Sequence, residues 1–251
     1  MQPIPRLALS LLFLVAPASA LFAADKAADA VVDKAIAALG GAEKLAKAAN
    51  HRMTSKGSIV INGEKNSVSS KALYSGIDRM RADLELNVGG NLIDISMVLN
   101  KTTGRRRLND NEMESEGAQL ANDFRNLFLH QTATTLLPLR EKGVELKALA
   151  DEMVGGKPAA VIEVVAPESK KCRIAFDKES GLPVRLTAEV MGFQGETIEQ
   201  EVEFADYKES GGVKKAMKVT TKRGGEPFIE SEVLTFDPVE RVDDEEFSKL
   251  D

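Results

Sequence analysis

Residues 79–88 read Arg-Met-Arg-Ala-Asp-Leu-Glu-Leu-Asn-Val, and apolar and polar side chains alternate strictly along this segment. The methionine, alanine, leucines and valine fall on one face, while the charged residues and the asparagine fall on the other. Because successive side chains of a β-strand point to opposite faces, the pattern predicts a strand with one buried and one solvated face. Such a strand is typical of an antiparallel sheet that covers an apolar core on one side.

Similar alternation recurs along most of the chain beyond about Lys56. Short glycine-rich clusters separate the alternating runs, as at residues 62–63, 88–91 and 211–212, and such clusters are typical of hairpin loops. The sequence therefore predicts about ten strands in an up-and-down antiparallel order, with the first strand near Lys56.

Helical periodicity appears in three places. Apolar residues recur at helical spacing over 25–39, a short helical piece follows at 42–49, and a longer helix is expected over 116–137. A curved sheet with an apolar inner face needs cover, which these helices can supply. The predicted fold class is mainly β with a few helices (α+β), in which a curved antiparallel sheet forms an unclosed β-barrel and helices cover or plug its open side.

The N-terminal residues are typical of a secretory signal peptide. Arg6 precedes the apolar run 7–15, and the small residues Ala18-Ser19-Ala20 follow. The run is much shorter than the roughly 20 residues that span a bilayer. We expect cleavage after Ala20, a single domain over 21–251, and a protein that is soluble in the periplasm.

Charge and cysteine content exclude some classes of function. The formal net charge is −6, and loss of Arg6 changes it to −7, so nothing favours nucleic acid as a partner. The three arginines at 105–107 are expected to form a solvated turn. Cys172 is the one cysteine, and its alternating neighbours indicate a buried, inert thiol.

We find no motif of an enzyme in the sequence. The two histidines, His51 and His130, have no second ligand at metal spacing and no triad-like context, so both are expected to be surface or capping residues. No nucleophile elbow of the Gly-x-Ser-x-Gly type is present. The prediction is a protein that is not an enzyme and has no cofactor and no metal site.

Several segments, taken in order, follow the layout of one group of bacterial envelope proteins. They are ALGGAEKL at 38–45, KG at 56–57, DRMR at 78–81, VGGKPA at 154–159, FDKESGLPVR at 176–185 and VDDEEF at 242–247. In these segments the chain resembles the outer-membrane lipoprotein-sorting (LolA/LolB-like) superfamily of periplasmic carriers. The resemblance implies an unclosed barrel with an apolar inner surface and a helical lid, which shields lipid or lipoprotein acyl chains. Arg79 and Arg81 match the basic position of the family's early strand and form either a functional pair or a plain outward-facing pair.

An apolar ligand also follows from physical reasoning alone. An acyl chain gains about 0.8 kcal/mol for each methylene removed from water, so a cavity could bind it without a polar code. The candidate lining residues are Met80, Leu84, Leu86, Ile95, Met97, Leu99, Leu120, Phe124 and Phe128. These residues would equally form an ordinary packed core.

Two functions are therefore predicted. The first is a carrier of lipids or lipoprotein acyl chains, whose partner is an apolar lipid or a lipidated protein. This function predicts an internal cavity. The alternative is an envelope protein-interaction or sensing module on the same scaffold with a filled core and an exposed apolar patch. In either case the chain is expected to be a monomer.

Overall fold

The computed structural model describes residues 18–168, 170–248 and 250. Its helices are α1 (Ala18–Leu39), α2 (Ala42–Ala48) and α3 (Gly117–Thr135), with short 3-10 turns η1 (Leu137–Arg140) and η2 (Asp244–Phe247). The predicted helices are thus confirmed, although α1 begins at Ala18 rather than at residue 25. Residues 1–17 of the predicted signal peptide lie outside the described residues, and the predicted cleavage point after Ala20 falls within α1.

The strands of the described residues form a single antiparallel sheet of fourteen strands, not about ten. They are β1 (Asn50–Ile61), β2 (Glu64–Ser75), β3 (Arg79–Val88), β4 (Asn91–Asn100), β5 (Thr103–Leu108), β6 (Asn111–Ser115), β7 (Glu145–Ala148), β8 (Glu152–Val154), β9 (Lys157–Ala166), β10 (Lys170–Asp177), β11 (Pro183–Met191), β12 (Thr197–Ser210), β13 (Val213–Arg223) and β14 (Glu226–Pro238). Strands β5 to β8 are only three to six residues long, so they lack the long alternation that reveals a strand. The first strand also begins earlier than predicted, at Asn50.

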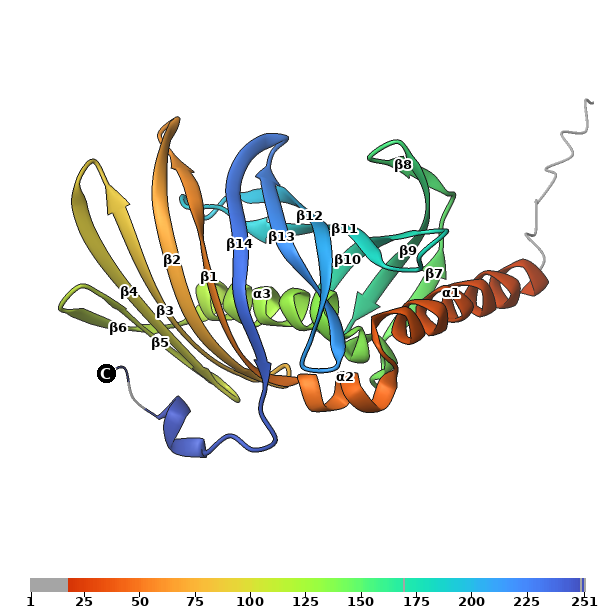
Figure 1. The fold of residues 1–251 in the computed structure, drawn as a ribbon, viewed down its shortest axis with the longest axis horizontal. Helices are drawn as coiled ribbons and strands as arrows, with labels where there is room; N and C mark the ends of the chain where they lie inside the picture. Colours follow the sequence, from red (N-terminus) through yellow and green to blue (C-terminus); the bar gives the residue numbers. More distant parts are fainter. Residues whose placement is uncertain (1–17, 169, 249, 251) are drawn as a thin grey trace, which may run out of the picture.

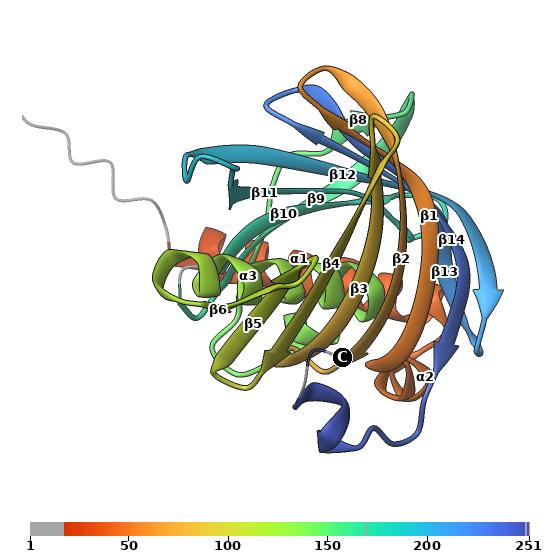
Figure 2. The same ribbon diagram turned by 90° about the vertical axis from the view of Figure 1, so that its left-hand side faces the viewer.

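Strand order follows chain order, as an up-and-down sheet requires. There are two departures: β1 pairs with β14, and β7 pairs with β9 rather than with β8, which also pairs with β9. The sheet thus runs from β6 through β1 and β14 to β7. The ends β6 and β7 do not pair with each other, which leaves the barrel unclosed. The predicted fold class is therefore confirmed, and Figures 1 and 2 show the curved sheet with α3 on its concave side.

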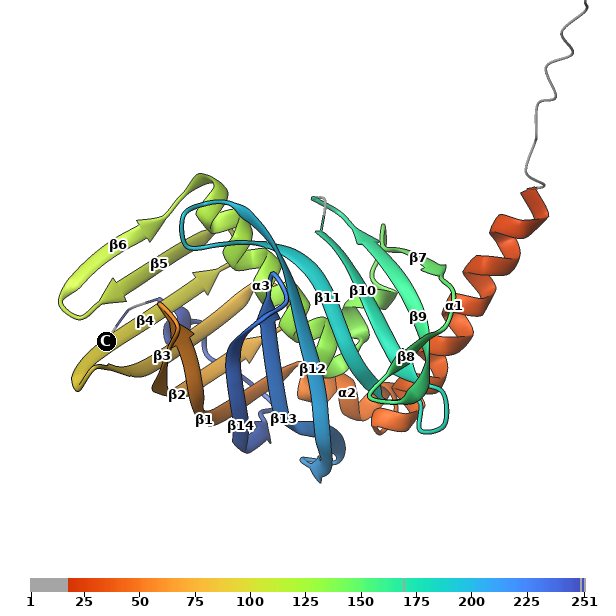
Figure 3. The ribbon, with the colours of Figure 1, turned by 90° about the horizontal axis from the view of Figure 1, so that it is seen from above.

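Helix α3 spans the opening of the barrel because of its place in the chain. It follows directly after the edge strand β6 and leads through η1 to the opposite edge strand β7, as the view in Figure 3 shows. Leu136 ends the helix with a left-handed backbone conformation, and Pro138 follows two residues later. The connection from edge to edge thus places the helix across the gap.

Two apolar clusters meet beneath the helices. The larger one joins the buried stripe of α1, including Val32, Ala35 and Leu39, to strands β9–β11 and the end of α3. Cys172 belongs to this cluster, and burial raises the pKa of its thiol to about 12, so the prediction of a buried thiol is confirmed. The smaller cluster joins β2–β4 to the first half of α3. The core therefore lies on the concave face, as the alternation of residues 79–88 predicts.

One glycine permits a close approach between the first and last strands, β1 and β14. A Cβ at Gly57 would lie 1.9 Å from the carbonyl oxygen of Glu230 on the paired strand β14. Any other residue would push β1 away from β14 at the seam that joins the first and last strands. The close packing of β1 against β14 thus explains why a glycine occupies this position of the first strand.

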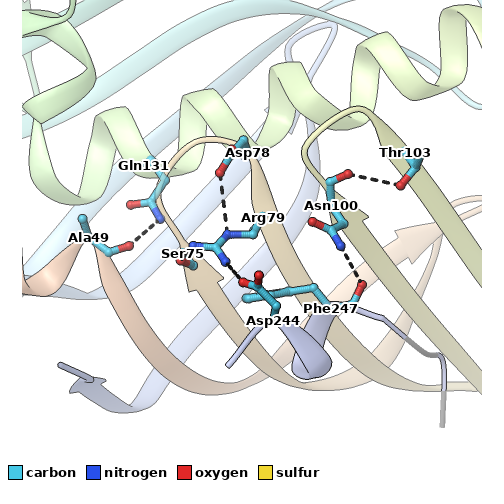
Figure 4. A network of polar contacts seen from close by, with 9 residues as sticks. All are labelled: Ala49, Ser75, Asp78, Arg79, Asn100, Thr103, Gln131, Asp244 and Phe247. Carbon is cyan, nitrogen blue, oxygen red and sulfur yellow. Dashed lines mark hydrogen bonds and ion pairs between the residues drawn. The ribbon is translucent and has the colours of Figure 1, made fainter. Parts of the chain in front are cut away.

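After β14 the chain crosses the outer face of the sheet. The ring of Phe247 is 1% exposed and packs on Leu73 and Val98. Asp244 pairs with Arg79 at 2.6 Å, and the Asn100 amide donates to the carbonyl oxygen of Phe247 at 3.4 Å (Figure 4). The C-terminal segment is therefore tied to the convex side, away from α3.

Candidate ligand-binding pocket

A pocket of about 300 Å³ lies between α3 and the inner face of β11–β14. Its apolar wall includes Met53, Leu129, Leu186, Val202, Phe204 and Val219. The volume is at the lower end of the range of small-molecule sites, roughly 300–1,000 Å³. The pocket is thus large enough for a slender apolar ligand.

A larger depression, of about 1000 Å³, lies on the outer face of the sheet. Most of its walls carry charged or hydroxyl groups, for example Lys56, Ser69, Glu85 and Glu232, and it is more open to solvent. Such walls keep their contacts with water and offer little to an apolar ligand. The smaller pocket beneath α3 is therefore the better candidate site.

Polar contacts hold α3 over the inner face of the sheet, from strands β5 and β11 and from the turn before β1. The backbone N–H of Met191 in β11 donates to Asn122 Oδ1 at 2.9 Å, and Gln131 Nε2 donates to the carbonyl oxygen of Ala49 at 3.1 Å. Asp123, which is buried, forms an ion pair with Arg106 of β5. The expectation of a solvated turn at residues 105–107 was therefore wrong, because these arginines lie in a strand and Arg106 points toward α3.

Two histidines lie beside the pocket and contact each other. His51 Nδ1 lies 2.8 Å from the carbonyl oxygen of Ala48, and His51 Nε2 lies 3.3 Å from His130 Nε2. Because a carbonyl only accepts, neutral His51 carries its hydrogen on Nδ1, and its Nε2 accepts from His130. His51 thus caps α2, as expected, but the expectation of surface histidines was wrong. The sequence could not show this, because the two residues are 79 positions apart.

Burial controls the charge of this histidine pair. Desolvation, and then the nearby charge of Lys215, lowers the pKa of His51 to about 3 and holds the pKa of His130 well below its usual value. The ring of Tyr74 stacks on both imidazoles, and burial raises the pKa of its phenol to about 12. The three rings are therefore neutral at pH 7.

Lys215 is a buried cation at the pocket wall. Lys215 is 9% exposed. Its Nζ donates to Thr134 Oγ1 at 2.9 Å and lies 5.3 Å from the centre of the Phe236 ring. Burial lowers the pKa of this ammonium from its usual 10.5 to about 8. Within the described part of the chain, no carboxylate forms an ion pair with Lys215. The group is thus still charged at pH 7 and has one hydrogen-bond partner.

The opposite end of the same strand reaches solvent. The guanidinium of Arg223 lies 4.0 Å from the centre of the Phe228 ring and 5.8 Å from that of Phe193, which is 78% exposed. Arg223 Nε also donates to Gln200 at 3.0 Å. Because Arg223, Phe228 and Gln200 line the pocket, this aromatic and basic group marks its open end.

The structure gathers most of the sequence-predicted lining residues in the smaller apolar cluster. Met80, Leu84, Met97, Leu99, Leu120 and Phe124 belong to that cluster. Phe128 lies in the larger cluster, and Leu86 and Ile95 lie on the inner faces of β3 and β4 by register. None of the nine lines the pocket beneath α3, so their role toward a ligand stays a prediction.

The predicted basic pair lies on the outer face. Arg79 binds Asp244 and Ser75 and packs over the ring of Phe247, whereas Arg81 pairs with Asp83. Arg79 thus attaches the C-terminal segment to the sheet. A functional role for either arginine stays a prediction.

Lys215 was missed by the sequence analysis, although a signal exists. Lys214 and Lys215 are consecutive in β13, and consecutive side chains of a strand point to opposite faces. One of the two lysines must therefore face the interior of a sheet with one buried face. Adjacent charged residues in a strand are therefore a signal for a charge on the inner face.

In residues 18–168, 170–248 and 250, no group of three or more His, Cys, Asp or Glu side chains is placed to hold a metal ion. None of the helices in this part of the chain is long and apolar enough to cross a membrane.

Comparison with known proteins rests on structure. No family model and no curated protein matches the sequence. A LolA superfamily protein from Nitrosomonas europaea matches with a TM-score of 0.55 at 8% identity, covering 88% of this chain and 97% of that one. A DUF1329 family protein from Desulfovibrio piger matches with a TM-score of 0.54 at 11% identity, covering 88% and 96%.

A third solved structure bears on the predicted resemblance. A putative outer membrane lipoprotein-sorting protein domain from Vibrio parahaemolyticus matches with a TM-score of 0.51 at 12% identity, covering 86% of this chain and 97% of that one. At these identities the likeness concerns the fold and not the activity. The resemblance inferred from the sequence is thus confirmed at the level of the fold: this chain is similar in fold to a LolA superfamily protein and to a lipoprotein-sorting protein domain.

Proposed function

We propose that the mature chain, residues 21–251, is an exported periplasmic protein that binds an acyl chain of a lipid or lipoprotein and carries it. The pocket of about 300 Å³ between α3 and β11–β14 carries this proposal. A helix that crosses the gap of an unclosed barrel encloses an apolar space on one side, and this is the geometry that a carrier of acyl chains needs.

The size and lining of the pocket suit one acyl chain. At about 30 Å³ for each water-sized group, the pocket holds on the order of ten such groups. Burial of ten methylenes, at about 0.8 kcal/mol each, gives a driving force of roughly 8 kcal/mol before the losses of association. Apolar contacts alone can therefore supply the affinity for an acyl chain.

Mass spectrometry of organic extracts tests the proposal. The protein is produced with its own N-terminus in a bacterial host and purified from the periplasm without detergent. We expect a stoichiometric phospholipid, fatty acid or lipopeptide in the extract, and a mature N-terminus at Leu21. A protein that stays in the cytoplasm with residues 1–20 intact would contradict the proposed export.

A matched pair of variants locates the ligand. Ala133 lines the pocket, whereas Ala121 is exposed on the same helix. Ala133→Phe fills the space and should remove the ligand from a folded protein, and Ala121→Phe should leave it bound. Equal ligand content in both variants would place the ligand elsewhere, with the nine sequence-predicted residues as the next candidate site.

The alternative function is an interaction module that recognises an envelope protein. Several large apolar side chains are exposed, including Leu92, Met153 and Phe193, and exposed apolar side chains are the usual basis of protein contacts. A well-folded protein that carries no lipid in the extraction experiment would favour this function over the carrier.

A further inference from the structure

We infer that the pocket beneath α3 takes an amphiphile with an anionic head, namely a long-chain carboxylate, whose head group binds Lys215. The inference rests on the proposed function and names the class of ligand. It is drawn from the buried cation at one end of the pocket and the apolar wall between the two ends.

The ammonium of Lys215 has fewer hydrogen-bond acceptors among the described residues than it has hydrogens. It has three hydrogens, and the described residues give it one hydrogen bond, to Thr134, and a contact with the face of the Phe236 ring. A buried charge is stable only when it is paired or hydrogen-bonded. An anion in the pocket would supply the missing partner in a setting of low dielectric, where such a contact is strong.

The surrounding groups do not compete for this role. The titratable groups that face Lys215 are His51 of β1 and His130 of α3, and burial and Lys215 keep both neutral. Tyr74 of β2 stacks on the histidines and holds its proton. Lys215 is thus the charge at the inner end of the pocket, and its single charge matches a carboxylate rather than a phosphate dianion.

The pocket follows the course of one strand, β13. Lys215 and Arg223 both line it and are eight residues apart in β13, which is about 26 Å at 3.3 Å for each residue. Val219 lies between them on the same wall. A head group at Lys215 would therefore send its chain along β13 toward the open end at Phe193 and Phe228.

Three ligands with one chain length separate the contributions of head and tail. Titration calorimetry of the delipidated mature protein at pH 7 is carried out with myristate, myristyl alcohol and myristyl phosphate below their aggregation concentrations. We expect myristate to bind at least about tenfold more tightly than the alcohol, the gain typical of a charged hydrogen bond. Lys215→Met should abolish this preference, while Lys214→Met, which removes an exposed lysine on the other face, should retain it.

Each other outcome has a distinct meaning. Equal affinity of the wild-type protein for myristate and the alcohol would overturn the inference and leave the carrier function standing. A Lys215-dependent preference for myristyl phosphate over myristate would overturn the carboxylate in favour of a phosphate head. Failure of all three ligands to bind would instead overturn the proposed function. The first comparison uses the wild-type protein, so it does not depend on the folding of a variant.

Discussion

The inner face of the sheet meets α3 in two different ways. On the side of β2–β4, the large side chains of Met80, Leu99 and Leu127 fill the space beneath the helix. On the side of β11–β14, a pocket of about 300 Å³ remains, with Lys215 in its wall. One helix thus covers a filled core on one side and a hollow on the other.

The helix itself explains this difference. Leu120, Phe124 and Leu127 recur at helical spacing and face the filled side, whereas Asn126, His130 and Ala133 form a second stripe that faces the pocket. The first stripe is bulky, whereas the residues of α3 that line the pocket are small or polar except for Leu129. In this half-barrel, the residues of the covering helix, more than those of the sheet, therefore decide which side is hollow.

The largest expected effect comes from the filled side. Leu99→Ala should lower the free energy of unfolding by about 2–5 kcal/mol, because the side chain is fully buried and leaves a cavity. Acyl-chain affinity of the folded protein should be unchanged. Urea unfolding measures the loss, with Val202→Ala at the pocket wall as the comparison. A larger loss in Val202→Ala would mean that the pocket side is the better-packed one.

The next effect concerns the buried ammonium. Its pKa is about 8 in the folded protein against 10.5 when exposed, so the unfolded state binds the proton more strongly. The cost of burying the charged ammonium lowers the stability of the fold fully below about pH 8, and this loss disappears as the pH rises from about 8 to 10.5. One pKa unit corresponds to about 1.4 kcal/mol, which gives a total of about 3 kcal/mol.

Lys215→Met removes this pH dependence. The difference in unfolding free energy between Lys215→Met and the wild-type protein should shrink by about 3 kcal/mol between pH 7.5 and 10.5, roughly the range between the pKa values of Lys215 in the folded and unfolded states. Lys214→Met serves as the control, because its exposed ammonium should behave alike in both states. A constant difference across this range would show that Lys215 is solvated and the pocket is open there.

The histidine pair should make the fold sensitive to acid. Both pKa values are lowered in the folded protein, so as the pH falls below about 6.5 the unfolded state takes up protons and stability declines. His130→Gln keeps a donor for His51 and should reduce the slope by up to about 1.4 kcal/mol per pH unit. Urea unfolding between pH 5 and 6 measures it, and an unchanged slope would place His130 in water.

The smallest effect is expected on the outer face. Arg79→Ala removes an ion pair with the exposed Asp244, so the loss of stability should be less than about 1 kcal/mol. Carboxypeptidase digestion should remove the C-terminal segment faster, while acyl-chain affinity stays the same. Reduced affinity would give Arg79 the functional role that its position in the family resemblance implies, and would weaken the contrast between inner and outer faces.

Much of the fold could be predicted from local patterns. Alternation in residues 79–88 correctly assigns inner and outer faces, because the period of a strand is encoded in neighbouring residues. The apolar stripe of α3 likewise predicts a helix that covers the sheet. Strands β5–β8 escaped prediction because they are too short to show a period.

The pocket could not be predicted, because it depends on contacts between distant segments. Lys215 meets Thr134, which is 81 residues away, and His51 meets His130 across 79 residues. Alternation shows which side chains face inward, but not which of them touch. The nine predicted lining residues are therefore inward-facing candidates, and sequence alone leaves open whether they fill space or bound it.

Photo-crosslinking can show directly whether the β11–β14 side of the sheet is the hollow one. The mature protein is loaded with a fatty acid that carries a diazirine in mid-chain, irradiated, digested and mapped by mass spectrometry. We expect labelled peptides from β12–β14 and from residues 126–134 of α3, with labelling lost in Ala133→Phe. Labelling confined to β3, β4 and residues 120–124 would contradict this expectation and would place the ligand among the residues that pack the filled side.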